Sequence, residues 1–101
     1  MSSKSTMFPQ LFTPLLIRNT KIRNRIVSTG HDTTMPTDGT VNDALVAYHR
    51  ARARGGVGLI VAQVTGVHES ARYTNHVLMG TDDNCIIGFS KLAEVVHKEG
   101  A

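Results

Sequence analysis

The order of its apolar patterns most constrains what this chain can fold into, because two short β-type runs alternate with two helical patterns. The first run covers residues 25–28 and the second covers residues 57–62. The second run is almost entirely apolar, which is typical of a strand buried on both faces. A strand–helix–strand–helix order predicts parallel strands with helical crossovers, where loops at the strand C-termini carry the chemistry. We therefore expect an α/β fold.

The first helical pattern covers residues 41–54. Thr40 and Asp43 resemble a capping box with a shortened acid at its start. Gly55 suits the left-handed position that often follows the end of a helix. The sequence thus predicts where this helix begins and where it ends.

The second helical pattern extends to about residue 99, with Thr81 or Asp83 as the N-cap and Gly100 as the C-cap. Its apolar residues recur at helical spacing. The predicted buried stripe consists of Ile86, Phe89, Leu92 or Ala93, and Val96.

Three further segments complete the predicted organisation. Residues 15–17 and 21–23 flank a polar turn and predict a small hairpin, which could close the bottom of a barrel. Residues 29–39 carry loop signals. The connection over residues 64–80 is much longer than the usual two to six residues, and such long loops tend to be functional.

Length and charge exclude several classes of protein. A chain of 101 residues is one domain at most, and 41% hydrophobic and 19% charged residues are ordinary for a globular protein. The net charge is +3, but its one basic cluster, Arg50, Arg52 and Arg54, falls in the last turn of a predicted helix. Cations there offset the helix dipole, so a solvated helix end is favoured over nucleic-acid binding.

Cys85 is the single cysteine, so the sequence predicts no disulfide framework and fits a reduced, intracellular setting. The first six residues are polar and lead into no apolar leader segment. No run approaches the roughly 18 apolar residues of a membrane span. We therefore expect a soluble, cytoplasmic protein without a membrane partner.

Two motifs invite functional readings that their context contradicts. Gly55, Gly56 and Gly58 precede a strand, whereas the glycines of a dinucleotide fingerprint follow a strand and open a helix. His68 and Glu69 begin like a zinc-protease helix, but Arg72 stands where the second histidine is needed. We predict neither a dinucleotide fingerprint nor a metal site.

The ends of the two predicted strands have different expected roles. Asn24 begins the first strand, at the end of a barrel that usually serves stability. Ser28-Thr29-Gly30-His31 follows it at the opposite end, where small residues allow a planar ligand to approach the backbone. A surface turn with an incidental histidine is an equal alternative. Gln63 ends the second strand and suits a satisfied polar position inside a barrel.

Several segments together make the chain similar to the N-terminal part of the old yellow enzyme family of flavin-dependent ene-reductases, over residues 8–101. The resemblance leans toward the dienoyl-CoA reductase and amine-dehydrogenase or demethylase branch. The matching segments are Leu11-Phe12-Thr13-Pro14-Leu15, Lys21-Ile22-Arg23-Asn24-Arg25-Ile26-Val27, Asp38-Gly39, Tyr48-His49-Arg50-Ala51-Arg52-Ala53, Gly55-Gly56-Val57-Gly58-Leu59-Ile60, Thr65-Gly66-Val67-His68 and Val96-His97-Lys98-Glu99-Gly100-Ala101.

This resemblance implies an eight-stranded TIM barrel that binds FMN noncovalently. Residues 1–101 would form an incomplete N-terminal portion of that domain, with the bottom hairpin and the first two βα units. The residues implied to contact the cofactor are Ser28, Thr29, Gly30, His31, Asp32 and Val64. The chain departs from the family where Thr29-Gly30-His31 stands in place of a small residue, Pro and Met, and where Gln63 stands in place of an acid. Either Asp32 or, with a one-residue gap, His31 takes the flavin-tuning position, and Val64 replaces the usual Ala or Gly.

The implied activity is oxidoreduction in which NAD(P)H reduces FMN, and the flavin then reduces an activated alkene or related small-molecule acceptor. An amine-oxidising or demethylating enzyme and a noncatalytic assembly module are the alternatives. The family's catalytic residues come from later strands, so no catalytic residue is predicted here. An iron–sulfur cluster would belong only to a further C-terminal part.

The first two units of a barrel leave an open strand edge. Such an edge favours association, either as a homo-oligomer or with another polypeptide. The family holds the FMN phosphate with the last strands of the barrel, so we expect these 101 residues alone to bind FMN weakly and to be inactive.

Overall fold

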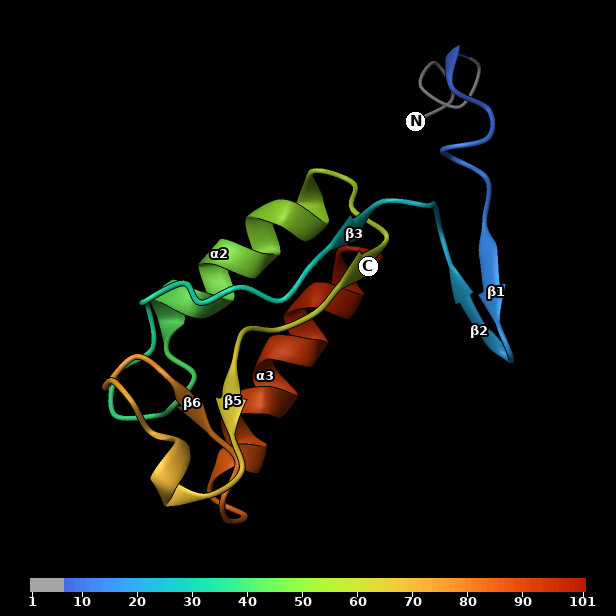
Figure 1. Ribbon diagram of the computed structural model, residues 1–101. Coiled ribbons are helices and arrows are strands. Elements are labelled where there is room, and N and C mark those ends of the chain that lie inside the picture. Colours follow the sequence, from blue (N-terminus) through green and yellow to red (C-terminus); the bar gives the residue numbers. More distant parts are fainter. Residues whose placement is uncertain (1–6) are drawn as a thin grey trace.

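The computed structural model describes residues 7–101 and shows two helices beside short strands (Figure 1). The polar residues 1–6, from which we expect no leader segment, lie outside the described part. The elements in chain order are β1 (Leu15–Ile17), β2 (Thr20–Ile22), β3 (Val27–Ser28), α2 (Asp43–Arg54), β4 (Leu59–Ile60), β5 (Thr65–Gly66), the 3-10 helix η1 (Glu69–Ala71), β6 (Leu78–Met79) and α3 (Cys85–Lys98).

β3 and β4 form the parallel pair that the sequence predicts, with α2 as the crossover between them. Val27 lies opposite Leu59 and Ser28 opposite Ile60. The pairing continues beyond these residues, since the Val61 N–H donates to the Ser28 carbonyl over 2.9 Å. The expectation of burial on both faces is wrong, because Val61 is 48% exposed. Within residues 7–101 the two strands have only each other as hydrogen-bonded neighbours.

The start of α2 corrects the predicted cap. Asn42 is the N-cap, and its side-chain oxygen accepts from the Leu45 N–H over 3.0 Å. Thr40 lies two residues before this cap, and its N–H and hydroxyl both donate to the Thr37 carbonyl, at 3.1 and 2.9 Å. That bond closes a two-residue turn in which Asp38 and Gly39 both have positive φ, as type I′ turns require.

The end of α2 also differs by one residue from the prediction. Gly55 keeps a helical φ of −70°, and Gly56 takes the left-handed conformation with φ 113°. Two adjacent glycines satisfy the same sequence signal, so the pattern could not distinguish them.

Helix α3 begins later than predicted, and neither Thr81 nor Asp83 is its N-cap. Asn84 precedes it without a side-chain capping bond, and the Asp82 carboxylate accepts from the Asn84 N–H over 2.8 Å. At its other end Gly100 has φ 99°, as a residue just past a helix often does. The predicted stripe is confirmed at Leu92 and Val96, which are buried, and wrong at Ile86, which is 54% exposed.

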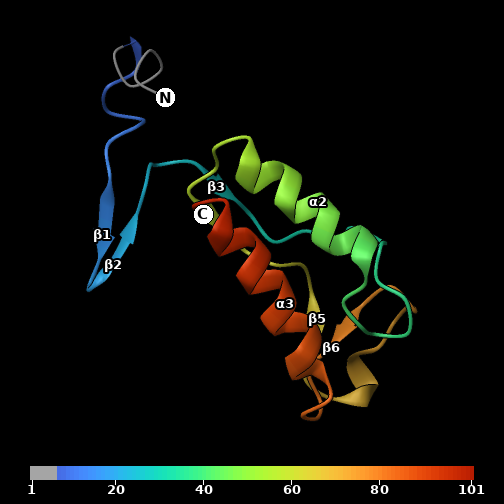
Figure 2. The same ribbon diagram turned by 180° about the vertical axis from the view of Figure 1, so that it is seen from behind.

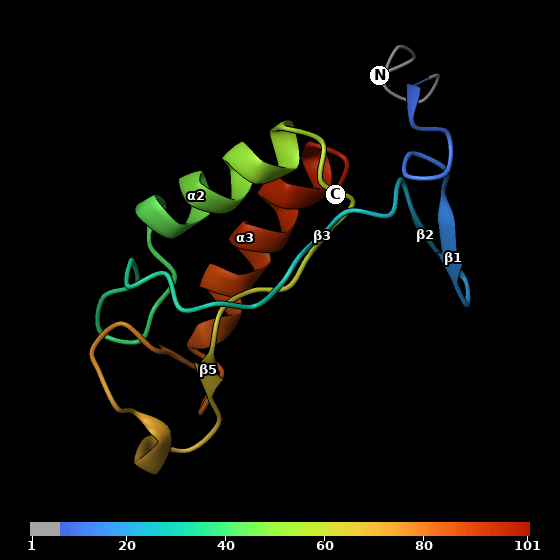
Figure 3. The same ribbon diagram turned by 45° about the horizontal axis from the view of Figure 1, so that its top comes forward.

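The core lies where α2, α3 and the strand pair meet. Figures 2 and 3 show the two helices side by side on one face of the strands. The buried residues of this core are Val46 and Ala53 from α2 and Leu92 and Val96 from α3, with Ile60 and Ala62 packed against them. The helical spacing of the apolar residues therefore brings the helices together over β4.

Strands β1 and β2 form the predicted hairpin, with a tighter turn than expected. Only Arg18 and Asn19 lie between the strands, and Arg18 has a positive φ of 52°. The hairpin stands to one side of the helices (Figure 1), which helps make the molecule elongated, 47 × 27 × 21 Å.

The connection over residues 64–80 contains regular structure and is not a plain loop. β5 and β6 pair in parallel, with Thr65 opposite Leu78 and Gly66 opposite Met79. The Met79 N–H also donates to the Gly39 carbonyl over 2.9 Å. These bonds tie the connection to the turn that precedes α2.

The residues just before β3 join the C-terminal ends of both helices to the strands. The Arg23 guanidinium donates four hydrogen bonds, to the carbonyl oxygens of Ala53, Val57 and Glu99, over 2.6 to 3.2 Å. The buried Asn24 side chain donates to the Gly56 carbonyl over 2.6 Å and accepts from the Ile26 N–H over 3.0 Å. The predicted structural role of Asn24 thus has a physical basis.

Candidate functional site

The predicted flavin segment leaves β3 at Ser28 and runs, exposed, past the end of β4. Gly30 approaches that end closely: a Cβ added there would lie 3.1 Å from the Ala62 oxygen and 3.3 Å from Val61 Cγ1. A side chain at this position would therefore press against the neighbouring strand. The glycine keeps the backbone of residues 29–32 against the strand pair.

Gln63 joins this segment to the end of the second strand. Its side chain is only 3% exposed, and its Oε1 accepts from both the hydroxyl and the N–H of Thr33, the latter over 3.3 Å. Its Nε2 donates to the His76 carbonyl over 2.9 Å. The structure therefore brings residues 28–33 beside Gln63 and Val64, and the expectation that Gln63 is satisfied is confirmed. The Val64 side chain is 41% exposed.

The two candidates for the flavin-tuning position both use their side chains within the protein. His31 Nδ1 lies 2.9 Å from the Thr29 carbonyl oxygen, and Nε2 lies 2.5 Å from the Tyr48 hydroxyl on α2. The Asp32 carboxylate accepts from the Tyr73 hydroxyl over 3.0 Å and from the Thr34 N–H over 3.1 Å. Both side chains are therefore already engaged in hydrogen bonds within the protein.

The backbone of the segment offers what its side chains do not. Within residues 7–101, the N–H groups of Gly30, His31 and Asp32 have no hydrogen-bond acceptor, whereas the next three N–H groups along the chain do. Residues 30–32 are exposed, so these unpaired N–H groups do not carry the free-energy cost of a buried donor without an acceptor. We refer to these three N–H groups as the donor row, and a ligand edge that carries carbonyl or ring-nitrogen acceptors would suit them.

Two titratable groups near the segment have altered acidity. The hydrogen bond to Asp32, with some desolvation and the charge of that carboxylate, raises the pKa of Tyr73. Burial, together with the charges of His31 and Arg52, lowers the pKa of His49. His49 is 1% exposed, and neither ring nitrogen has a partner within the described residues.

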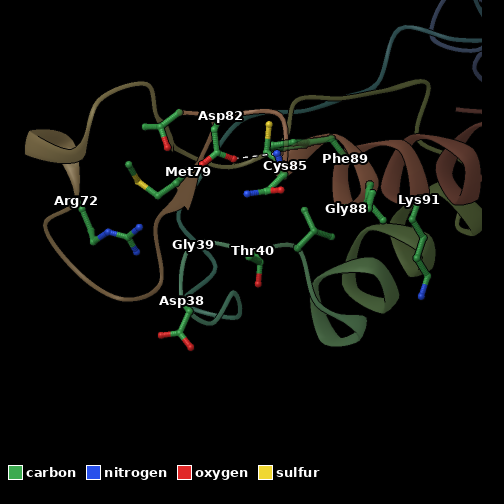
Figure 4. A pocket seen from close by; sticks show the side chains of 14 residues that line it. Asp38, Gly39, Thr40, Arg72, Met79, Asp82, Cys85, Gly88, Phe89 and Lys91 are labelled. Atoms are coloured by element: carbon green, nitrogen blue, oxygen red, sulfur yellow. Dashed lines mark hydrogen bonds between the residues drawn. The ribbon is translucent and has the colours of Figure 1, made fainter.

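A hollow in the surface lies away from this segment. A pocket of ≈ 450 Å³ opens between the turn before α2 and the first turns of α3. Arg72 and Met79 stand on one side of it, and Gly88, Phe89 and Lys91 of α3 stand on the other (Figure 4). None of the predicted flavin residues lines this pocket.

The histidine motif rejected as a metal site has a structural role. His68 caps η1, since its Nδ1 accepts from the Ser70 N–H over 3.1 Å, and Glu69 pairs with Arg72 over 2.7 Å. In the part of the chain that the structure describes, no group of three or more His, Cys, Asp or Glu side chains could hold a metal ion. Neither α2 nor α3 is long and apolar enough to cross a membrane.

A sequence model described as the NADH:flavin oxidoreductase / NADH oxidase family matches residues 10–101. The chain belongs to this family. It is 43% identical over 98 residues to the NADH oxidase of Thermoanaerobacter brockii, covering 95% of this chain and 15% of that protein. It is 34% identical over 101 residues to the NADPH dehydrogenase of Bacillus subtilis, covering 94% of this chain and 29% of that protein.

Solved structures confirm the expected fold. A 2-naphthoyl-CoA reductase superposes with a TM-score of 0.90 at 28% identity, covering 94% of this chain and 15% of that one. The Old Yellow Enzyme of Pichia sp. AKU4542 superposes with a TM-score of 0.81 at 25% identity, covering 91% of this chain and 24% of that one. The chain therefore has the α/β fold of the first part of a TIM barrel, and the resemblance to the old yellow enzyme family is confirmed.

Sequence reasoning missed the side chains that fix the segment. Thr33, Tyr48 and Tyr73 bind Gln63, His31 and Asp32, and they lie 30, 17 and 41 residues away from these partners. Tyr48 lies within the predicted helix over residues 41–54, but no periodicity pairs it with a loop histidine. The polar character of Thr33 and Tyr73 was the only available signal.

Proposed function

We propose that these residues form the flavin-contacting first part of an FMN-dependent oxidoreductase of the old yellow enzyme type. When bound, FMN would supply the redox chemistry by which NAD(P)H reduces an activated alkene or a related small-molecule acceptor. This chain supplies the surface that binds and orients the isoalloxazine. Ser28, Thr29, Gly30, His31, Asp32 and Val64 are the proposed contacts.

The N–H groups of Gly30, His31 and Asp32, which have no acceptor within residues 7–101, carry this proposal. The isoalloxazine edge presents carbonyl and ring-nitrogen acceptors, which are complementary to backbone donors. Gly30 holds that backbone against the end of β4, so the donors are fixed at the end of the strand pair where ligands of such folds bind. The chain's residues thus fit the cofactor that the family implies.

Val64 would contribute its backbone at the neighbouring position. The bond between the buried Gln63 side chain and Thr33 supports this role, because it fixes the end of the second strand, which Val64 follows, to the same loop. The Val64 side chain is larger than the family's usual Ala or Gly, and it would have to lie away from the flavin plane.

The affinity of these contacts alone is small. Two or three hydrogen bonds at about 0.5–1.5 kcal/mol each give a few kcal/mol. Immobilising a ligand costs roughly 4 kcal/mol or more. The family's phosphate site, which supplies charge-assisted bonds, lies on later strands. We therefore propose that the 101 residues bind FMN weakly unless the rest of a barrel is present.

Electron transfer in the other direction, from a substrate to the flavin, also has support. The chain is 36% identical over 97 residues to a protein named N,N-dimethylglycine/sarcosine dehydrogenase, from Chromohalobacter salexigens, of which it covers 14%. Electrons in such an enzyme run from substrate to flavin. The proposed flavin contacts serve either direction, so substrate and direction depend on residues outside this segment.

The test is a chimera in which this chain replaces the matching first part of the Bacillus subtilis NADPH dehydrogenase. We expect the chimera to take up FMN, seen as quenching of flavin fluorescence, and to oxidise NADPH when an activated alkene is supplied. The isolated 101 residues, titrated in parallel, should leave most of the FMN free.

The matched control is the Bacillus enzyme in which only the segment that corresponds to residues 28–32 is replaced by that of this chain, in case the larger replacement does not fold. A folded chimera and a folded control that both leave FMN unbound would refute the proposal. Stoichiometric binding by the isolated 101 residues at micromolar affinity would contradict the expected weakness.

A role as an assembly module follows from a different observation. Each of β3 and β4 has one open edge within residues 7–101, and Ile87 on α3 is 81% exposed. Open edges and exposed apolar side chains favour association. Size-exclusion chromatography with flavin absorbance separates the possibilities: a colourless monomer weakens the assembly role, and colourless oligomers support it.

A further inference from the structure

The His31 ring lies between a loop carbonyl and a helix hydroxyl, and that pair of partners determines where its proton sits. The Thr29 carbonyl can only accept, so Nδ1 at 2.9 Å must carry a hydrogen. In the neutral ring Nε2 is then bare, and it accepts from the Tyr48 hydroxyl. The two contacts are consistent with only one neutral tautomer.

Tyr48 is itself held in place on α2. The Arg52 guanidinium carbon lies 3.4 Å from the centroid of the Tyr48 ring, as in a cation–π contact. Its ring also meets the buried His49 edge to face, with centroids 5.2 Å apart. The hydroxyl therefore projects from a rigid helix position, while His31 belongs to an exposed loop.

We propose that Tyr48 is a positioning residue, whose hydroxyl fixes His31 as the Nδ1–H tautomer and holds its ring against α2. With both ring nitrogens engaged, His31 offers the ligand its backbone N–H and not its imidazole. The consequence is that the contact with Tyr48 on α2 holds in place the loop that carries the donor row over residues 30–32. That the ligand is FMN rests on the proposed function, whereas the tautomer does not.

The tautomer is measured on the 101-residue chain, with ¹⁵N-labelled histidine and long-range ¹H–¹⁵N correlation above pH 7.5. A His31→Gln variant identifies the His31 signals. We expect a protonated Nδ1 and an unprotonated Nε2. In Tyr48→Phe, which keeps the ring stacked on Arg52, we expect the Nε2 resonance to move and the Nε2–H tautomer to become populated.

Tyr73→Phe is the matched control, because it removes a hydroxyl bonded to Asp32 on the same loop without touching His31. It should leave the His31 signals unchanged. A wild-type His31 in the Nε2–H form would overturn the proposal, and so would an Nε2 resonance that is the same in wild type and Tyr48→Phe.

The second readout is FMN affinity in the chimera described above, where Tyr48→Phe should weaken binding about two- to tenfold, the effect of one hydrogen bond. If the chimera takes up no FMN while the His31 signals change as expected, the proposed function fails and the positioning role stands. If FMN binds equally well with and without the hydroxyl, the positioning role fails and the proposed function stands.

Discussion

The two ends of the β3–β4 pair use polar groups in opposite ways. At the start of the strands, Arg23 and Asn24 bond the carbonyl oxygens of both helix ends, so the polar groups there bind one another. At the far end, the N–H groups of residues 30–32 have no acceptor within the described part of the chain. One end is saturated with internal bonds, and the other leaves its donors open.

This difference teaches how a βα unit separates stability from function. The saturated end also collects charge: Arg54 lies 3.3 Å and Arg50 3.4 Å from Glu99, and the bond from Arg54 lowers the pKa of that carboxyl although partial burial opposes it. The open end keeps its conformation through a few side chains behind the loop. Substitutions at the two ends should therefore affect different measurements.

The largest expected effect comes from Arg23→Ala. The guanidinium donates four hydrogen bonds to three elements, and hydrogen bonds from charged groups are the strong ones. Allowing for its partial exposure, we expect the free energy of unfolding to fall by about 3 kcal/mol in urea titrations. Arg23→Lys is the control and should recover less than half, because one ammonium cannot reach all three carbonyls. A loss below about 1 kcal/mol for Arg23→Ala would show that the bonds do not hold the helix ends.

Asn24→Ala should cost about 2 kcal/mol, because it leaves the buried Gly56 carbonyl and the Ile26 N–H without partners. Gly58→Ala should disturb the same contact, since the added Cβ would lie 2.5 Å from Asn24 Oδ1. The double variant should therefore lose clearly less than the sum of the two single losses. If the two losses in the free energy of unfolding simply add in urea titrations, Asn24 and Gly58 do not act through a shared contact, and the prediction is wrong.

The comparison also explains what the sequence could predict. The parallel pair, its helical crossover and the hairpin follow from apolar periodicity and turn residues, which are local signals. Asn24 was placed correctly because strand starts in such folds serve stability. Arg23 was not singled out, because its partners Ala53, Val57 and Glu99 are 30, 34 and 76 residues away.

The misplaced start of α2 has a local cause. Thr40 fits a cap by sequence, but it belongs to the turn over residues 37–40, and Asn42, which directly precedes the helix, is the cap. The β5–β6 pairing was missed because two-residue strands carry no periodicity. The candidate site is predicted only as a segment, since the side chains that orient it come from α2 and from the 64–80 connection.

At the open end, Gln63→Leu should cost about 1–2 kcal/mol, since it removes the acceptor of Thr33 and the donor to the His76 carbonyl while keeping an apolar side chain in the buried space. The loss should be smaller than for Arg23→Ala, and FMN affinity in the chimera should fall as well. Thr33→Val is the matched control, which removes only the hydroxyl side of the pair. A Gln63→Leu chimera that binds FMN as tightly as the parent would show that the two ends do not differ as described.

The smallest expected effect is the pH dependence that His49 adds behind the open end. Burial lowers its pKa in the folded protein below the ordinary value of 6.5, so the unfolded chain takes up the proton first as the pH falls. The contribution of His49 to stability is therefore fully present above pH 6.5 and is lost below it, by at most about 1.4 kcal/mol per pH unit. Urea titrations between pH 7.5 and 5 should show this loss in wild type and a flatter profile in His49→Leu. Because Glu99 titrates from a lowered pKa, it contributes below this window, and equal slopes in the two proteins would mean that His49 is not the group that titrates.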